Sequence, residues 1–335
     1  MAAEQELQQT ERRLAQTGIR ATACSWVSSQ ANAHSALAAS SDGSLNMLTS
    51  TLDSGGLRLD SSTYCSATVT SVSASRQASA GLLALADGSV RAFSTLDVLH
   101  SLDNGASRSI DVHSRGSIRC ACFGAIGVSV GAADGCVVFH DLSSLGNTST
   151  ASLPSERASK IDCAMGGSHF LAVSAGASPG VQMWDCRISG ERLRMQIPQA
   201  FEREVVTCVD VAKHDECIVA AGTSKGSAVL WDARKTDAPV SWCSRAVDRY
   251  AVSIKLDSSG RIGTAASGGA QPLPAVVAST SGQLSRVEWR YESSGSAVEA
   301  LKEDSPMLAM DLNSRNGPHI LYFTQAEDAV HVLSN

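Results

Sequence analysis

Two segments of the chain match Gly-x-Ser-x-Gly, the spacing that surrounds the nucleophile of many serine hydrolases. They are Gly127–Gly131 and Gly222–Gly226. A serine in this motif becomes a nucleophile when it lies on a sharp turn between a buried strand and a helix. The first match falls inside a predicted strand and the second at a predicted hairpin. We therefore predict no catalytic residues and expect a protein that is not an enzyme.

Metal and cofactor chemistry are not indicated either. His214 is followed by Asp215 and Glu216, but two acids beside one histidine in a short polar link are typical of a solvated turn. The ten cysteines are spread singly through apolar runs without a Cys-x-x-Cys pair, as buried small side chains in a reducing compartment would be. Neither a P-loop nor a dinucleotide-binding fingerprint is present, so we expect no metal, no cofactor and no small-molecule substrate.

The charge and the hydrophobic pattern exclude other partners. The formal net charge of −6 argues against nucleic acid, because phosphate backbones are bound by basic surfaces. No apolar run approaches the roughly 20 residues of a membrane span, so we expect no membrane insertion. Residues 1–17 are polar and have no signal-peptide core, which predicts an intracellular protein.

The residues around the second Gly-x-Ser-x-Gly match belong to a larger pattern. Two β-rich runs, Val205–Val211 and Cys217–Ala221, precede a turn at Lys225-Gly226, and a third run, Ser227–Trp231, ends in Trp231-Asp232. Strand, polar link, strand, glycine turn, strand and Trp-Asp is the order of elements in one blade of a β-propeller. One blade cannot bury both of its faces, so the pattern must repeat.

The repeat is visible in the spacing of the turn residues, which is 45 to 56 residues. These residues are Gly43, Gly88, Gly135, Gly180, Gly226, Gly282 and, in the equivalent place, Asp328. The period is close to that of the WD repeat, which is roughly 40–45 residues. We predict an all-β, seven-bladed WD-repeat propeller over residues 18–335 with four antiparallel strands per blade. The glycines are expected in two-residue hairpin turns, which need φ > 0.

Three parts of the chain are less regular. The segment 258–274, rich in Gly, Ser, Ala and Pro, is predicted to be a loop insertion between the first two strands of blade six. We expect a tolerated insertion, and the alternative is a partner-contact or modification site. The arm 1–17 either supplies a closing strand for the last blade, from within Glu11–Thr17, or forms a helix. Outer strands give the weakest signals, at Val98–Leu102, Leu193–Ile197 and Val240–Cys243.

The Trp-Asp pairs are expected to be structural. Trp184 and Trp231 should fill the space between blades, and Asp185 and Asp232 should accept hydrogen bonds in turns. The same position is degenerate elsewhere, at Phe93-Ser94, His140-Asp141 and Trp289-Arg290. Because the Gly-His dipeptide usual near the start of such repeats is absent, we predict that its buried polar network is missing and that apolar packing holds the blades together.

Several segments resemble one branch of the WD-repeat proteins, the small WD-repeat nucleoporins of the Y-shaped outer-ring complex. They are Leu171–Val173, Met183–Arg187, Cys208–Asp210, Ile218–Ala220, Leu230–Arg234, Pro239–Ser241, Met310–Leu312 and Ala326–Val332. The resemblance implies a seven-bladed propeller without catalytic residues that is held by an α-solenoid nucleoporin. It implies a place in the nuclear pore complex at the nuclear envelope and a role in nucleocytoplasmic transport.

The same residues also allow a different class of protein. Trp-Asp-x-Arg occurs twice, ending at Arg187 and at Arg234. It resembles the motif by which WD-repeat substrate receptors dock on the linker of cullin-RING ubiquitin ligases. In that alternative each arginine is an exposed partner contact. Otherwise each arginine pairs with a neighbouring acid at the edge of a blade.

Overall fold

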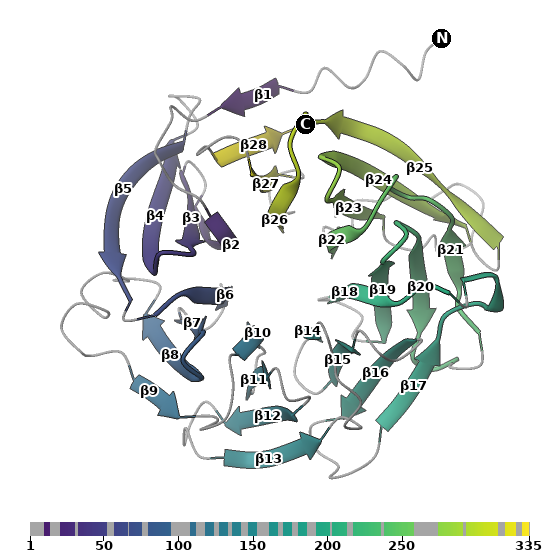
Figure 1. The fold of residues 1–335 in the computed structure, drawn as a ribbon, viewed down its shortest axis with the longest axis horizontal. Coiled ribbons are helices and arrows are strands. Elements are labelled where there is room, and N and C mark those ends of the chain that lie inside the picture. The colour runs from purple at the N-terminus through teal and green to yellow at the C-terminus, as the bar shows by residue number, and fades with distance from the viewer. Residues whose placement is uncertain are drawn as a thin grey trace.

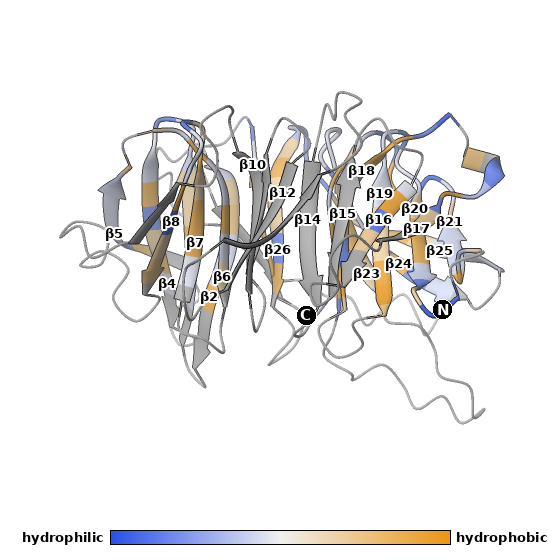
Figure 2. Cartoon of the chain, turned by 90° about the horizontal axis from the view of Figure 1, so that it is seen from below, coloured by the Kyte–Doolittle hydropathy of each residue, from blue (hydrophilic) through white to orange (hydrophobic). Residues whose placement is uncertain are grey.

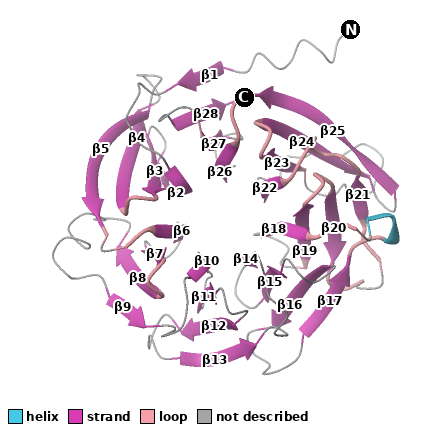
Figure 3. Ribbon diagram, in the orientation of Figure 1, coloured by secondary structure: helices cyan, strands magenta, loops and turns pink. Residues whose placement is uncertain are grey.

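The structure is a computed structural model, and nearly all of the residues that it describes form β-strands (Figure 3). The described residues are 10–13, 21–30, 33–51, 57–65, 67–75, 80–94, 108–111, 118–123, 127–132, 136–141, 147–152, 161–166, 170–175, 180–185, 192–201, 203–212, 217–235, 238–257, 274–290, 293–313, 319–325 and 330–334. Within them, one short 3-10 helix, η1 (Gln199–Phe201), precedes the fifth blade.

The strands form seven antiparallel blades arranged in a ring (Figure 1). From the innermost strand outward, blades one to six are β2–β5, β6–β9, β10–β13, β14–β17, β18–β21 and β22–β25, and blade seven is β26, β27, β28 and β1. This confirms the predicted all-β propeller.

The strand bounds of blades one to three are β2 (Ala21–Gln30), β3 (Ala33–Ser40), β4 (Ser44–Thr51), β5 (Leu57–Tyr64), β6 (Val69–Ser75), β7 (Ala80–Leu85), β8 (Ser89–Ser94), β9 (Arg108–Asp111), β10 (Ile118–Phe123), β11 (Gly127–Ala132), β12 (Cys136–Asp141) and β13 (Asn147–Ser152). Those of blades four and five are β14 (Ile161–Gly166), β15 (Phe170–Ala175), β16 (Gly180–Asp185), β17 (Arg192–Gln196), β18 (Val206–Val211), β19 (Ile218–Thr223), β20 (Ala228–Asp232) and β21 (Ser241–Cys243). Those of blades six and seven are β22 (Ala251–Leu256), β23 (Ala275–Ser279), β24 (Gln283–Arg290), β25 (Ser293–Lys302), β26 (Met307–Asn313), β27 (His319–Thr324), β28 (Val330–Ser334) and β1 (Thr10–Arg13).

The N-terminal arm contributes a strand to the last blade. β1 pairs antiparallel with β28, with Thr10 opposite Ser334 and Arg13 opposite His331. The outermost strand of blade seven therefore comes from the start of the chain, and its other three strands come from the end (Figure 1). Pairing with a sheet edge overrides the helical propensity of this polar segment.

The hairpins between the second and third strands differ from the expected two-residue turns. In blade one the loop is Ser41-Asp42-Gly43, and the Gly43 N–H donates to the Ser40 carbonyl at 3.1 Å. Gly43 has φ 90°, and its equivalents Gly88, Gly226 and Gly282 have φ between 83° and 91°. Three-residue hairpin loops place a left-handed residue last, after a type I turn, which is why glycine is needed there. Gly135 and Asp328 lie outside the described residues.

The loops 41–43, 86–88, 224–226 and 280–282 lie at one end of the blades, and we call this end of the ring the turn face. The connections to the following blades reach the same face, because the N–H groups of Cys65, Val247 and Glu303 donate to the carbonyls of Gly43, Gly226 and Gly282 at 2.8, 3.0 and 2.9 Å. In the edge-on view, hydrophobic residues lie in the strands and hydrophilic ones in loops along the upper margin (Figure 2).

Two outer strands depart from expectation. The fourth strand of blade two is β9, at Arg108–Asp111, and the predicted Val98–Leu102 lies outside the described residues. β21 pairs antiparallel with β20 and also in parallel with the start of β25, where Ser241 lies opposite Ser293. Blades five and six therefore share one eight-stranded sheet.

The expected insertion in blade six lies between β22 and β23. Its two ends are joined by a hydrogen bond of 2.8 Å from the Asp257 N–H to the Pro274 carbonyl, and residues 258–273 are not described.

Candidate functional site

Trp231 lies at the interface between blades four and five. It is the fourth residue of β20, is fully buried, and packs in one apolar cluster with Val209, Val219 and Met195. Its indole Nε1 donates a hydrogen bond of 3.1 Å to the carbonyl of Gln196, at the end of β17 in the preceding blade. The side chain therefore fills the space between the blades and satisfies its polar atom across it.

The next residue, Asp232, holds the turn that follows the strand. Its Oδ1 accepts the backbone N–H of Arg234 at 3.0 Å, and the guanidinium of Arg234 donates from Nε to Oδ1 and from Nη2 to Oδ2, both at 2.8 Å. The side chain of Asp232 is 7% exposed and that of Arg234 is 58% exposed. The side-chain hydrogen bond from Arg234 lowers the pKa of Asp232, helped by the backbone bond and the positive charge, while burial acts in the opposite direction.

This arrangement bears on the two alternatives for the Trp-Asp-x-Arg motif. The Arg234 side chain is accessible, but its guanidinium is held in a two-pronged contact with the acid of its own motif. A partner acid would have to compete with Asp232 for the same fork of donors. In the first copy of the motif, Trp184 and Asp185 end β16 opposite Leu171 and Phe170. Their side chains and Arg187 lie outside the described part of the chain.

The position of Trp289 differs from the prediction. In blade five Trp231 lies opposite Val219, and in blade six the equivalent pair is Val287 opposite Ala275. Val287 is therefore the counterpart of Trp231, and Trp289 lies one pleat further along β24, buried in the cluster that spans blades five and six. Unlike Trp231, its indole Nε1 has no hydrogen-bond partner among the described residues.

The Gly-x-Ser-x-Gly serines have ordinary structural places. The first motif lies within β11, and the second spans the end of β19 and the hairpin that follows it. Ser224 Oγ accepts the backbone N–H of Val205 at 3.1 Å. Neither segment leads from a strand into a helix, as the hydrolase motif requires.

Repeated hydrogen bonds between inner strands were not predicted. Thr207, the second residue of β18, donates from Oγ1 to the carbonyl of Ala251 in the next blade at 2.7 Å. Thr22, the second residue of β2, donates in the same way to Val69 O at 3.2 Å. In each case the accepting carbonyl belongs to the first residue of the neighbouring inner strand.

The fifth residue of the inner strand makes a second kind of contact with the next blade. Asp210 Oδ2 accepts the backbone N–H of Leu256 at 2.8 Å. Asp311 Oδ2 accepts that of Trp26 at 2.8 Å. In blade one the position is a serine, and Ser25 Oγ accepts the Ala74 N–H at 3.2 Å. The Thr-x-x-Asp or Thr-x-x-Ser spacing of Thr207 with Asp210 and of Thr22 with Ser25 is the sequence signal that could have revealed both contacts.

A buried polar network of another kind, which was not predicted from the sequence, is present in blade five. Glu204, which is 8% exposed, precedes β18 and accepts hydrogen bonds from the hydroxyls of Thr223 and Ser227. Thr223 Oγ1 in turn accepts the Ser227 N–H at 2.9 Å. A glutamate therefore supplies a network within blade five, and the separate hydrogen bonds of Thr207 and Asp210 add to apolar packing between the blades.

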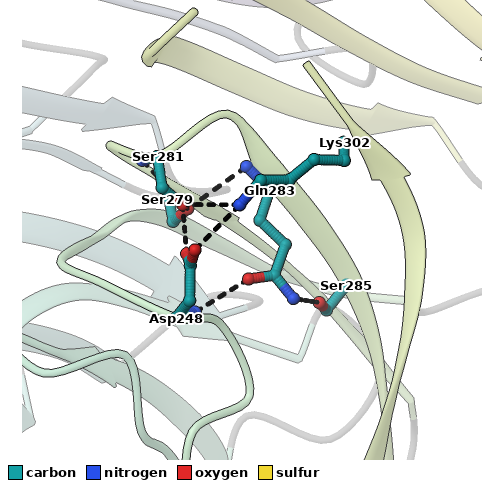
Figure 4. A network of polar contacts seen from close by, with 6 residues as sticks. All are labelled: Asp248, Ser279, Ser281, Gln283, Ser285 and Lys302. Atoms are coloured by element: carbon teal, nitrogen blue, oxygen red, sulfur yellow. Dashed lines mark hydrogen bonds and ion pairs between the residues drawn. The ribbon is translucent and has the colours of Figure 1, made fainter. Parts of the chain in front are cut away.

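A further polar cluster holds the connection between blades five and six to blade six at the turn face (Figure 4). Asp248, in the connection from β21 to β22, accepts hydrogen bonds from the Ser281 hydroxyl and from Lys302 Nζ, the latter at 2.8 Å. Its backbone N–H donates to Gln283 Oε1 at 2.8 Å. Burial of the Asp248 carboxyl acts to raise its pKa. The hydrogen bonds from Lys302 and Ser281 and the positive charge of Lys302 outweigh burial, so the pKa of Asp248 is lowered.

Within the described residues no group of three or more His, Cys, Asp or Glu side chains could hold a metal ion. The predicted turn of His214, Asp215 and Glu216 lies outside them. The cysteines that the structure describes form no disulfide. No described helix is long and apolar enough to cross a membrane.

Known structures share this fold at low sequence identity. A chain of the Mitotic Checkpoint Complex is similar with a TM-score of 0.70 and 18% identity, covering 97% of this chain and 91% of that one. U3-55K gives 0.72 and 12%, covering 97% and 98%. The WD40 repeats of RRP9 give 0.71 and 12%, covering 97% of each chain. No protein-family model matches the chain, and no curated protein matches it significantly. The chain therefore has the fold of WD40-repeat propellers, and identity at this level carries no conclusion beyond the fold.

Proposed function

We propose that the chain is a non-catalytic protein-interaction scaffold and a structural component of the Y-shaped outer-ring subcomplex of the nuclear pore. The observation that supports the scaffold role is the ring itself, which is closed at its outer edge by β1 on β28 and at its inner edge by Asp311 on Trp26. A ring closed at both edges holds its loops in fixed relative positions, so that partners meet a rigid surface.

The specific place in the pore rests on the resemblance of segments such as Leu230–Arg234 and Met310–Leu312 to the outer-ring WD-repeat nucleoporins. In this proposal the main partner is an α-solenoid nucleoporin, the protein lies at the nuclear envelope, and it supports nucleocytoplasmic transport. The propeller contributes shape and contact surface and no bond chemistry.

Affinity purification of the tagged full-length protein from its native cells, followed by mass spectrometry at moderate salt, tests this proposal. We expect outer-ring nucleoporins in near-equal amounts. Recovery of a cullin and its linker without nucleoporins would overturn the pore assignment in favour of a ubiquitin-ligase receptor.

The variant Arg234→Ala separates the two classes further. A ligase receptor that docks through this arginine would lose the linker, whereas a pore component would retain its nucleoporins. Arg286→Ala, an exposed arginine on β24, is the matched control and should change neither outcome.

A further inference from the structure

The hairpin of blade five differs from its counterparts in the residue before the glycine. In blades one and two this residue is Asp42 or Asp87, whose Oδ1 accepts the backbone N–H two residues later at 2.8 and 2.9 Å. In blade five it is Lys225, which is exposed. The blade-five turn is held instead by Thr223, through its bond to the Ser227 N–H. A cation therefore stands where turn chemistry favours a carboxylate.

Three arginines flank this lysine on the turn face. Arg203 lies in the segment that leads into β18. This segment is joined to the blade-five hairpin by a hydrogen bond of 2.9 Å from the Ser224 N–H to the Val205 carbonyl. Arg245 and Arg249 lie in the connection from β21 to β22, which is joined to the same hairpin by the bond from Val247 N to Gly226 O of 3.0 Å. The hairpin tip is thus held between two connections that carry arginines.

All four side chains are exposed, and none has a hydrogen-bond or ion-pair partner among the described residues. Two other exposed cations of the described chain are engaged, since Lys302 binds Asp248 and Arg234 binds Asp232. Among the described residues, the two nearby acids have other partners: Asp248 accepts hydrogen bonds from Lys302 and Ser281, and the buried Glu204 accepts them from Thr223 and Ser227. A chain of net charge −6 therefore carries four exposed cations on adjoining loops, without an ion-pair partner in the part of the chain that the structure describes.

Arg245 adds an independent sign of function. Its φ is 54°, and it is the one non-glycine residue with positive φ in the described part of the chain. Glycine or asparagine would adopt this left-handed conformation more easily. Strained residues of this kind gather at functional sites, where their side chain is needed in spite of the backbone.

We propose that these four residues, Arg203, Lys225, Arg245 and Arg249, form a docking site for a carboxylate-rich segment of a partner protein. The site deepens the scaffold role and rests on it. An extended acidic segment fits because the cations stand on three neighbouring loops, so that successive carboxylates can meet successive cations. Nucleic acid fits less well, because its phosphate backbone requires a broad basic face, and the net charge of this chain is −6.

Binding of a fluorescently labelled oligoglutamate peptide to the full chain, followed by anisotropy, tests the site. We expect binding that weakens as salt is raised, because exposed charges are screened. Reversal of all four charges to Glu should weaken binding at least about tenfold, given the modest contribution of each exposed pair. The single variant Lys225→Glu should weaken it measurably. Arg286→Glu should not, because Arg286 lies away from the site on β24, although it is also exposed and without a partner among the described residues.

Arg245→Asn separates binding from folding. Asparagine tolerates left-handed backbone, so the variant should melt at the wild-type temperature or above it while binding oligoglutamate more weakly. Unchanged binding in this variant would remove Arg245 from the site.

Two results would overturn the proposal, namely no binding of oligoglutamate by the wild-type chain, or equal binding of a single-stranded oligonucleotide of the same charge. The second result would identify a general polyanion site. If oligoglutamate fails to bind while the purification still recovers nucleoporins, this site alone is overturned and the scaffold function stands.

Discussion

The carboxylate of Asp311, on the inner strand of the last blade, accepts the backbone N–H of Trp26, on the inner strand of the first, at 2.8 Å. Its other oxygen, Oδ1, lies 3.9 Å from Nζ of Lys255 in blade six. One side chain therefore links three consecutive blades across the point where the two ends of the chain meet. Asp210 makes the equivalent contact to Leu256 between blades five and six, where the chain is continuous.

Removing the Asp311 carboxylate should weaken ring closure. Asp311→Ala leaves the part-buried N–H of Trp26 without its acceptor, and a lost acceptor of this kind costs about 1–3 kcal/mol of unfolding free energy. Urea denaturation measures this loss. Asp60→Ala, at an exposed position on β5, is the control and should stay within about 0.5 kcal/mol of the wild type. Equal stability of both variants would show that β1 on β28 suffices to close the ring.

The indole of Trp231 should contribute through both its volume and its N–H. Trp231→Ala empties a fully buried site and should cost about 3–5 kcal/mol. Trp231→Phe keeps much of the volume but leaves the Gln196 carbonyl without its donor, so that about 1–2 kcal/mol should be lost.

Trp289→Phe is the matched control for the N–H contribution, because the indole Nε1 of Trp289 has no partner among the described residues. Thermal unfolding of Trp231→Phe and Trp289→Phe side by side compares them. A larger loss in Trp289→Phe would contradict the importance of the bond to Gln196.

Much of the fold could be predicted because propeller hairpins repeat in sequence. Glycines at Gly43, Gly88, Gly226 and Gly282 mark one end of each hairpin, since the last residue of the loop needs positive φ. Residue type alone gives the wrong blade position for Trp289. Its distance from the turn glycine would have shown that Val287 is the counterpart of Trp231.

The contacts between blades could not be predicted in the same way. The bonds of Thr207 to Ala251 and of Asp210 to Leu256 depend on how neighbouring inner strands are offset. The sequence pattern of one blade carries no information about the offset between the inner strands of neighbouring blades. The sequence does not decide the pairing of β1 for a related reason. A polar segment of four residues has no strand pattern of its own and is ordered by the edge that it joins.

Thr207 should stabilise the interface between blades five and six through its hydroxyl. Thr207→Val keeps the shape of the side chain and removes the donor to the carbonyls of Ala251 and Gly222, so that about 1–2 kcal/mol should be lost. Thr207→Ser keeps the hydroxyl and should lose less. Urea denaturation followed by tryptophan fluorescence measures both, and a greater loss in the serine variant would assign the effect to packing of the methyl group.

Acid should weaken the fold partly through Asp232. Its pKa is lowered in the folded chain, so the stability that it contributes is complete above the ordinary aspartate pKa of about 3.9 and disappears as the pH falls through the lower folded value. Asp232→Asn should therefore be less stable than the wild type at neutral pH by about 1 kcal/mol, a value kept small because Arg234 is largely exposed. The difference should shrink on acidification. Urea midpoints of the two proteins across this pH range measure it, with Asp60→Asn as the control. A difference that stays constant with pH would mean that the loss comes from altered turn geometry and not from the charge of Asp232.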